Sequence, residues 1–250
     1  MPASESFLKA LKNPVVTWKN PFDDEVKVIN PDICMSRFQV EFDNVGTRSL
    51  RAYIYTPRLQ LYSVGSDDDA TNLRDLTFAQ EIFGSKEVME KLCTGETRTP
   101  EQVTKRFGEF TDEWKVKKSP ISSFMCYSGD EPVGLFVLEE EGNGSAELSS
   151  LSAVQHWKKG YATEVGMLLY KYPRIVRDSG YKMADGSVLQ TVTATARPDN
   201  GSAIAMERLG LTCVGTEVKY GAERKVYRNT IEELDEVVSD TNFRAKLALD

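Results

Sequence analysis

The sequence has few of the residues that metal sites and disulfide frameworks require. It contains one histidine, His156, and four cysteines, which lie far apart and form no CxxC pair: Cys34, Cys93, Cys126 and Cys213. A structural zinc site takes four Cys and His ligands at close spacings. We therefore expect no metal site. The scattered cysteines favour reduced thiols and a cytoplasmic protein.

Long apolar segments and a basic excess are also missing. No run of about 18 apolar residues is present, so no transmembrane helix is expected, and the N-terminus does not follow the signal-peptide pattern. The net charge is −7 and the isoelectric point is near 5.0, which argues against a nucleic-acid surface. An acidic protein attracts cationic partners such as amines, although many enzymes are acidic for solubility alone.

From Pro57 onward the sequence alternates regularly between strand and helix patterns. The clearest helix start is Thr99-Pro100-Glu101-Gln102, which combines an N-cap, proline at the first helical position and a capping-box partner. A second helix is expected after a cap at Ser66. Strands are expected at 59–64, 122–127, 132–138, 146–154, 188–196, 212–219 and 224–228, and further helices at 163–176 and 203–209. This order predicts a mixed α/β (α+β) domain around one central sheet.

The two ends of the chain differ from this central part. Residues 1–55 contain four prolines and no long helical period. Alternating residues predict a strand pair there, 37–42 and 50–55, with a turn at 43–46. We therefore expect an N-terminal extension over 1–55, a main domain over 56–230, and a helical acidic tail over 231–250.

The strongest local signal for chemistry lies in residues 147–172. A predicted strand ends near Val154, a short loop follows, and a helix begins near Thr163. This geometry points several backbone N–H groups at one anion. Gly160 permits close backbone approach to a phosphate, while Lys158 and Lys159 add positive charge. The alternative is a plain strand-to-helix connection with two solvated lysines.

This segment resembles motif A of the GNAT superfamily of acetyltransferases, most closely its Rim-type branch, which acetylates protein N-termini and small amines. In that branch the motif often reads AELGYxLxPxYWGKGYATEA, and residues 146–165 read AELSSLSAVQHWKKGYATEV. Three further segments resemble the family in the same order: 56–59 (TPRL), 85–89 (SKEVM) and 202–211 (SAIAMERLGL). The resemblance covers about residues 56–230.

The resemblance implies a GNAT fold and acetyl-CoA as cosubstrate. Acetyl-CoA is expected in a V-shaped opening between two splayed parallel strands, 147–154 and 188–196. The strand backbone is expected to contact the pantetheine and the thioester carbonyl at Leu151, Ser152 and Ala153. The expected pyrophosphate contacts are the amides of Lys158, Lys159, Gly160, Tyr161, Ala162 and Thr163, with Asp199 or Asn200 as a further cofactor contact.

The same resemblance implies an N-acetyltransferase that acts by direct attack of a primary amine. The amine must be neutral, so a general base is required. Glu147 matches the family's strand carboxylate and is the predicted base, although an exposed strand residue is the alternative. Ser202 is the predicted proton donor to the leaving thiolate, with Tyr220 and Tyr227 as weaker candidates. His156 is expected to be a solvent-facing loop residue rather than a base.

Three positions depart from the family pattern. Lys158 replaces the first motif-A glycine, and lysine would strain the loop if that position needs a positive φ. Asp199 replaces an asparagine by strict count, with Asn200 next to it. Met206 stands where many members carry a tyrosine acid.

These departures leave alternatives open. The chain could instead be a GNAT-fold protein that binds CoA or a partner without turnover. A nucleotide-binding module unrelated to CoA would need a Walker motif or a GxGxxG pattern, and neither occurs. Within the enzyme hypothesis, a peptide or protein N-terminus and a small amine both remain open as acceptor. Both a monomer and a homodimer remain open as assembly.

Overall fold

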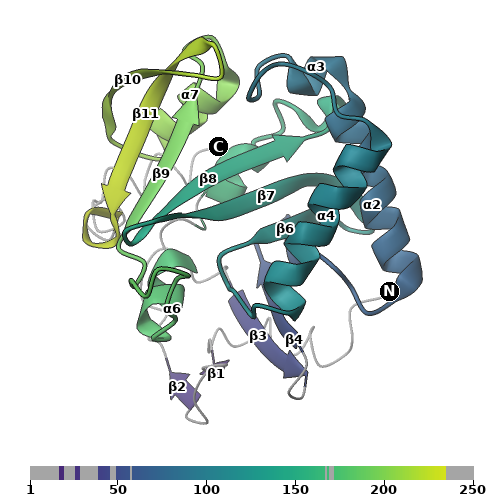
Figure 1. Cartoon of the computed structure of the whole chain (residues 1–250), viewed down its shortest axis with the longest axis vertical. Helices are drawn as coiled ribbons and strands as arrows, with labels where there is room; N and C mark the ends of the chain where they lie inside the picture. Colours follow the sequence, from purple (N-terminus) through teal and green to yellow (C-terminus); the bar gives the residue numbers. More distant parts are fainter. Residues whose placement is uncertain are drawn as a thin grey trace.

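The computed structural model describes residues 17–19, 26–28, 39–45, 49–56, 58–166, 168 and 172–234. Most of its strands form one nine-stranded sheet in the order β10-β11-β9-β8-β7-β6-β5-β4-β3 (Figure 1). The strands are β3 (Gln39–Val45), β4 (Ser49–Tyr55), β5 (Gln60–Ser63), β6 (Ser123–Ser128), β7 (Glu131–Gly142), β8 (Ser145–Ser152), β9 (Thr191–Ala196), β10 (Cys213–Lys219) and β11 (Ala222–Thr230). A separate antiparallel pair joins β1 (Thr17–Lys19) to β2 (Val26–Val28).

The helices are α2 (Asp69–Gly84), α3 (Lys86–Met89), α4 (Pro100–Lys115), α5 (Tyr161–Gly166), α6 (Tyr172–Asp178) and α7 (Gly201–Arg208), with a 3-10 turn, η1, at Val154–His156. The predicted capping box at the start of α4 is confirmed. The predicted cap of α2 at Ser66 is wrong. Asp68 is the N-cap and accepts from the Thr71 N–H, while the Ser66 hydroxyl accepts from the Asp68 N–H at 3.1 Å.

The structure describes the predicted helix 163–176 in two parts, α5 and α6. Of the connecting residues 167–171, the structure describes only Leu168.

The two faces of the sheet carry different helices. We call the face covered by α2 and α4 the α4 face; Val103, Phe107 and Phe110 of α4 pack there against Leu135 and Val137 of β7. The opposite face, which we call the α7 face, packs against α5, α6 and α7. Because successive strand residues point to opposite faces, each β8 side chain is assigned to one face by its neighbours. Figure 1 shows α4 lying in front of β6 and β7, with α2 beside it.

β3 and β4 extend the sheet at the edge opposite β10. They pair antiparallel from Gln39↔Tyr55 to Val45↔Ser49, and β4 pairs in turn with β5. Strand β3 therefore runs through residues 43–45, where a turn was expected. Leu50, Ala52 and Ile54 of β4 are at most 1% exposed, so β4 contributes to the main core.

Candidate active site

The parallel strands β8 and β9 separate partway along their length. They pair only from Ser145↔Thr191 to Leu148↔Ala194. Beyond that point β8 stays with β7 up to Ser152, and β9 stays with β11 up to Ala196. Beyond this point the backbone N–H and C=O groups on the facing edges of β8 and β9 do not pair with each other. The V-shaped opening that the motif implies is therefore present.

Close packing of β7 against β8 fixes the wall of this opening. A Cβ on Gly134 would lie 2.3 Å from the carbonyl oxygen of Leu151, so only glycine fits there. Of the predicted thioester contacts, Ala153 has both backbone groups engaged: its N–H donates to Val133 at 3.1 Å and its carbonyl accepts from His156 at 2.9 Å. The Leu151 carbonyl points at β7, beside Gly134, and the Ser152 carbonyl accepts from Trp157 Nε1 at 2.9 Å. Contact of these three residues with a thioester therefore stays a prediction.

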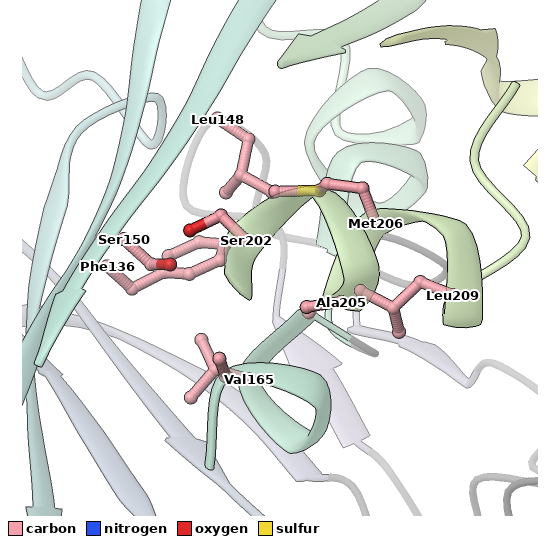
Figure 2. A pocket seen from close by; sticks show the side chains of 10 residues that line it. Phe136, Leu148, Ser150, Val165, Ser202, Ala205, Met206 and Leu209 are labelled. Atoms are coloured by element: carbon pink, nitrogen blue, oxygen red, sulfur yellow. The ribbon is translucent and has the colours of Figure 1, made fainter. Parts of the chain in front are cut away.

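On the α7 face, the opening leads into a narrow cavity between β8, α5 and α7 (Figure 2). Its volume is about 10 Å³, room for one water molecule. Figure 2 shows the Ser150 and Ser202 hydroxyls facing this cavity. The full lining comprises Phe136, Leu148, Ser150, Ala162, Val165, Gly166, Ser202, Ala205, Met206 and Leu209. Ser202 thus lies beside the splay, and Met206 fills the position where many family members carry a tyrosine.

The loop between β8 and α5 contains two residues in the left-handed backbone region. Lys158 has φ +61° and Gly160 has φ +77°. Lys158 therefore occupies a position that favours glycine, where the resemblance places a glycine. The left-handed backbone costs about 1–2 kcal/mol of stability for a residue other than glycine. Lys158, Lys159 and Gly160 are exposed, and the first N–H groups of α5 have no acceptor within the helix. The loop can thus present backbone donors and two cations to an anion.

A buried carboxylate anchors this loop to the start of β5. Glu164 of α5 is 7% exposed and accepts from the Arg58 N–H at 2.9 Å and Arg58 Nε at 2.6 Å, and also from the Thr56 hydroxyl. Arg58 Nη1 donates to the Lys159 carbonyl at 2.8 Å, and its guanidinium lies 5.1 Å from the Tyr161 ring centre. Arg58 and Glu164 lie in two of the segments that resemble the family, but no sequence pattern predicted the ion pair between them.

His156 is buried, so the expectation of a solvent-facing residue is wrong. It is 4% exposed and its ring lies 6.2 Å from that of Tyr161. The 3-10 turn η1 directs the ring inward, because the His156 N–H bonds back to Ala153. Lys159 Nζ lies 3.3 Å from Nδ1. Glu131 Oε1 lies 3.3 Å from Nε2 but without hydrogen-bond geometry, so Nε2 has no hydrogen-bond partner.

Glu147 lies on the α4 face, because its neighbour Leu148 packs on the α7 face. Lys219 Nζ of β10 lies 3.0 and 3.2 Å from its two oxygens, and the Thr195 hydroxyl donates to it at 3.1 Å. Burial alone would lower the pKa of Lys219, but the hydrogen bond and charge of Glu147 raise it. Glu147 is therefore held at the point where β8 and β9 begin to separate. Ser202 stands on the opposite face of the same opening.

The β9–α7 loop holds the predicted cofactor contacts Asp199 and Asn200. Asn200 caps α7, accepting from the Ser202 N–H at 3.0 Å, and its amide donates to the Lys91 carbonyl at 3.4 Å. Asp199 pairs with Lys91 Nζ at 3.2 Å. Both side chains thus tie α7 to the segment after α3, and their contact with a cofactor stays a prediction.

The two tyrosines considered as weaker acids have different surroundings. Tyr227 is buried under α7, its hydroxyl lies 3.3 Å from both the Ala203 carbonyl and Glu207, and burial raises its pKa to about 12. Tyr220 is 47% exposed in the β10–β11 turn, with its ring near Lys219.

A larger hollow of about 480 Å³ lies between α4, the end of β7 and the segment after α6. Glu139, one of its lining residues, pairs in register with Glu147. Its lining is Arg106, Glu109, Phe110, Glu113, Lys117, Ile121, Ser122, Leu138, Glu139, Glu140, Tyr181, Lys182 and Ala184. Because it begins one strand away from Glu147, this hollow is a candidate extension of the acceptor site.

Fold and site together define a class of protein. Residues 58–212 match the family model described as Acetyltransferase (GNAT) domain. The chain belongs to this family and has the GNAT fold. In the described residues, no group of His, Cys, Asp and Glu side chains could hold a metal ion, and no helix has both the length and the apolarity to cross a membrane.

Solved structures of similar fold include several acetyltransferases. A GNAT-family acetyltransferase from Bacillus anthracis is 17% identical, with TM-score 0.56, covering 72% of this chain and 99% of that one. RimJ of Mycobacterium smegmatis, bound to CoA-disulfide, is 17% identical, with TM-score 0.55, covering 76% and 88%. Spermidine N-acetyltransferase of Vibrio cholerae, bound to CoA and spermine, is 16% identical, with TM-score 0.54, covering 71% and 98%. No curated protein matches the chain in sequence.

Proposed function

We propose that this protein is an N-acetyltransferase that moves an acetyl group from acetyl-CoA to a primary amine by direct attack. The observation that carries this proposal is the gap between β8 and β9, with Glu147 on one face and the Ser202 cavity on the other. A thioester held in that gap is open to an amine from the α4 face. The leaving sulfur then lies towards the α7 face.

The residues beside the gap supply the steps of such a reaction. Glu147 removes a proton from the acceptor ammonium, directly or through water, so that the neutral nitrogen attacks the thioester carbonyl. Backbone N–H groups near Leu151 and Ser152 at the end of β8 stabilise the oxyanion. A C–N bond forms, the C–S bond breaks, and the second nitrogen proton passes to solvent. Ser202 gives its proton to the leaving thiolate and regains one from solvent.

The loop from Lys158 to Thr163 is the proposed pyrophosphate site. Its left-handed residues Lys158 and Gly160 expose the backbone, and the Glu164–Arg58 contacts hold the start of α5 in place. Lys158 and Lys159 complement the charge of the pyrophosphate.

The acceptor we propose is a peptide or protein N-terminus or a small amine, and we place the chain in the Rim-type branch. Residues 146–165 support that branch, and RimJ is among the proteins of similar fold. Proteins of similar fold are also named for acetylating spermidine and an aminoglycoside.

The second candidate is a CoA-binding protein without turnover. Two observations favour it: the left-handed Lys158 in the phosphate loop, and the narrow cavity that Met206 helps to fill.

The first test mixes the protein with acetyl-CoA and a panel of amines and peptides, and follows release of free thiol. Glu147→Gln should lower kcat about 10²- to 10⁴-fold, the usual contribution of a general base, while CoA affinity is unchanged. Glu217→Gln, at an exposed carboxylate of β10, is the matched control and should keep full activity. Saturable CoA binding without thiol release on any acceptor would instead favour the binding protein.

The phosphate-loop assignment is tested separately by Gly160→Asp. A Cβ there would lie 3.2 Å from Arg58 Nη2, on a backbone of φ +77°, and the added negative charge would oppose the pyrophosphate. CoA affinity should fall at least about tenfold, because a like charge at such a site costs more than 1.4 kcal/mol. Unchanged affinity in calorimetry would show that the pyrophosphate binds elsewhere.

A further inference from the structure

Four side chains on the α4 face form one hydrogen-bonded chain across four strands. Lys219 of β10 pairs with Glu147 of β8 at 3.0 Å, and Glu147 accepts from the Thr195 hydroxyl of β9 at 3.1 Å. The same hydroxyl accepts from Arg224 Nε of β11 at 3.2 Å. A single hydroxyl therefore joins the predicted base to a guanidinium.

Arg224 is buried, and its hydrogen bonding is incomplete. It is 4% exposed. Nε and Nη2 both bond to Thr195, the latter to the carbonyl at 3.3 Å, but Nη1 has no partner. Buried polar groups almost always have a partner, and a charged donor without one is costly. Nη1 therefore lacks an acceptor, which a ligand bound beside Thr195 can supply.

The two cations of this chain are not paired equally. Lys219 pairs with Glu147, and both Glu147 and Glu141, which accepts from the Thr193 hydroxyl, raise the pKa of Lys219. The Tyr220 ring lies 5.5 Å from Lys219 Nζ and 5.7 Å from Arg224 Cζ but brings no charge. Glu217 is opposite Arg224 in register but, in the described part of the chain, forms no ion pair with it. Among the described residues, Lys219 therefore has an ion-paired carboxylate and Arg224 has none.

We propose that Arg224 binds a carboxylate of the acceptor. The acceptor is then an amine with a carboxylate a few bonds away, either a free amino acid or a peptide with an acidic N-terminal residue. This inference rests on the proposed function, because it places the amine at Glu147. Since one hydroxyl separates Glu147 from Arg224, a molecule of that size reaches both, and guanidinium is the side chain best suited to a carboxylate.

At Arg224 the charge disfavours a second ammonium group on the acceptor. An ammonium group directed there would meet a guanidinium that has no ion-paired carboxylate among the described residues. A net charge of −7 over the whole chain does not offset a guanidinium at contact distance, because solvent and salt screen distant charges.

The kinetic test uses matched acceptors that differ only in the carboxylate. Glycine is compared with glycinamide, and a peptide beginning with Asp with the same peptide beginning with Asn; spermidine is the polycationic probe. The carboxylate member of at least one pair should have a kcat/KM about 10- to 100-fold higher, the range for a hydrogen bond to a charged group. If only the glycine pair shows this difference in kcat/KM, the acceptor is a free amino acid. If only the peptide pair shows it, the acceptor is a peptide.

Arg224→Gln should abolish this preference mainly through KM, with CoA affinity unchanged. The matched control is Arg228→Gln, at an exposed arginine of the same strand, which should keep the preference. Equal kcat/KM within both wild-type pairs, faster turnover of spermidine, or equal effects of the two substitutions would overturn the proposal. If Arg224→Gln unfolds, Arg224→Lys keeps the charge without the planar fork and should still weaken the preference.

A binding measurement separates this inference from the proposed function. Calorimetry on the CoA-saturated protein compares both pairs, glycine with glycinamide and the Asp peptide with the Asn peptide, without requiring turnover. Tighter binding of a carboxylate member that Arg224→Gln removes supports the carboxylate site even if no thiol is released, in which case only the enzyme proposal fails. Equal affinities within both pairs refute the site.

Discussion

At the scale of single residues, three unusual positions lie near the proposed acetyl-CoA site, while others, such as the left-handed Lys118 and the unpartnered Asn72 Oδ1, lie elsewhere. Lys158 occupies a left-handed backbone position. Arg224 Nη1 lies beside the chain that holds Glu147 and has no hydrogen-bond partner, and neither has His156 Nε2 beside the loop. Strained backbone and unpaired buried groups cost stability and persist where function requires them. These three positions therefore support a ligand site only together with the geometry of the splay.

Lys158 allows backbone strain to be separated from charge. Lys158→Gly and Lys158→Ala remove the same ammonium group, but only glycine relieves the φ of +61°. The glycine variant should be more stable than the alanine variant by about 1 kcal/mol. Urea unfolding of both measures this difference. If the loss of CoA affinity is equal in the two variants, the ammonium rather than the backbone accounts for it.

Asp75 gives a prediction on pH. It is 4% exposed and accepts from the Tyr127 hydroxyl. Burial raises its pKa above the ordinary 3.8, although Tyr127 and Arg74 act in the opposite direction. With a folded pKa above the unfolded one, its stabilising contribution is complete below 3.8 and is lost as pH rises through the folded pKa.

Asp75→Asn keeps an oxygen for Tyr127 but does not ionise. The stability of this variant relative to wild type should therefore rise between about pH 3 and pH 7. Urea unfolding at several pH values gives the two curves. Parallel curves would show that Asp75 has the same pKa in both states.

At the scale of elements, the position of α5 depends on contacts with a distant strand. Glu164 accepts three hydrogen bonds from Thr56 and Arg58, which lie between β4 and β5. The sequence predicted the loop and the helix start because both carry local signals. It did not pair Glu164 with Arg58, since 106 residues separate them.

Glu164→Ala should destabilise the protein by about 2–4 kcal/mol, because it leaves buried donors without an acceptor. It should also weaken CoA binding, since the start of α5 loses its anchor. Urea unfolding and calorimetry measure the two effects. Glu113→Gln breaks an exposed i,i+4 pair with Lys117 and should cost less than about 0.5 kcal/mol. Similar losses in both variants would argue against an anchoring role.

At the scale of the whole molecule, two strands outside the family match complete the sheet. The match begins at residue 58, but β3 and β4 pair onto β5, and β4 side chains enter the main core. We propose that residues 1–55 form an extension whose last strand is part of the folding unit.

Ile54→Ala tests this at one edge of the sheet. Ile54 is fully buried, so the substitution should lower the free energy of unfolding by about 2–5 kcal/mol. Val218→Ala, near the other edge, removes a side chain that is 80% exposed and should have an effect below about 0.5 kcal/mol. Comparable midpoints in urea for the two variants would place β4 outside the cooperative core.

The sequence by itself determined the features that depend on neighbouring residues. The capping box of α4, the approximate positions of most strands and the loop before α5 follow from periodicity, caps and glycine, which act over a few residues. The burial of His156 was missed because a 3-10 turn has a weak sequence pattern. Likewise, Asp68 and Ser66 are both residue types that favour the N-cap position. The backbone conformation of the folded chain places Asp68, not Ser66, at the start of α2.

Only the tertiary structure decided which charged groups meet at the splay. Lys219 and Glu147 are 72 residues apart in the sequence. Arg224 of β11 donates to Thr195 of the neighbouring strand β9. Such contacts depend on strand order and register, which arise when the whole sheet is assembled. The sequence therefore indicated an acetyl-CoA loop and a base, while the guanidinium beside that base, and with it a proposed acceptor class, emerged only from the fold.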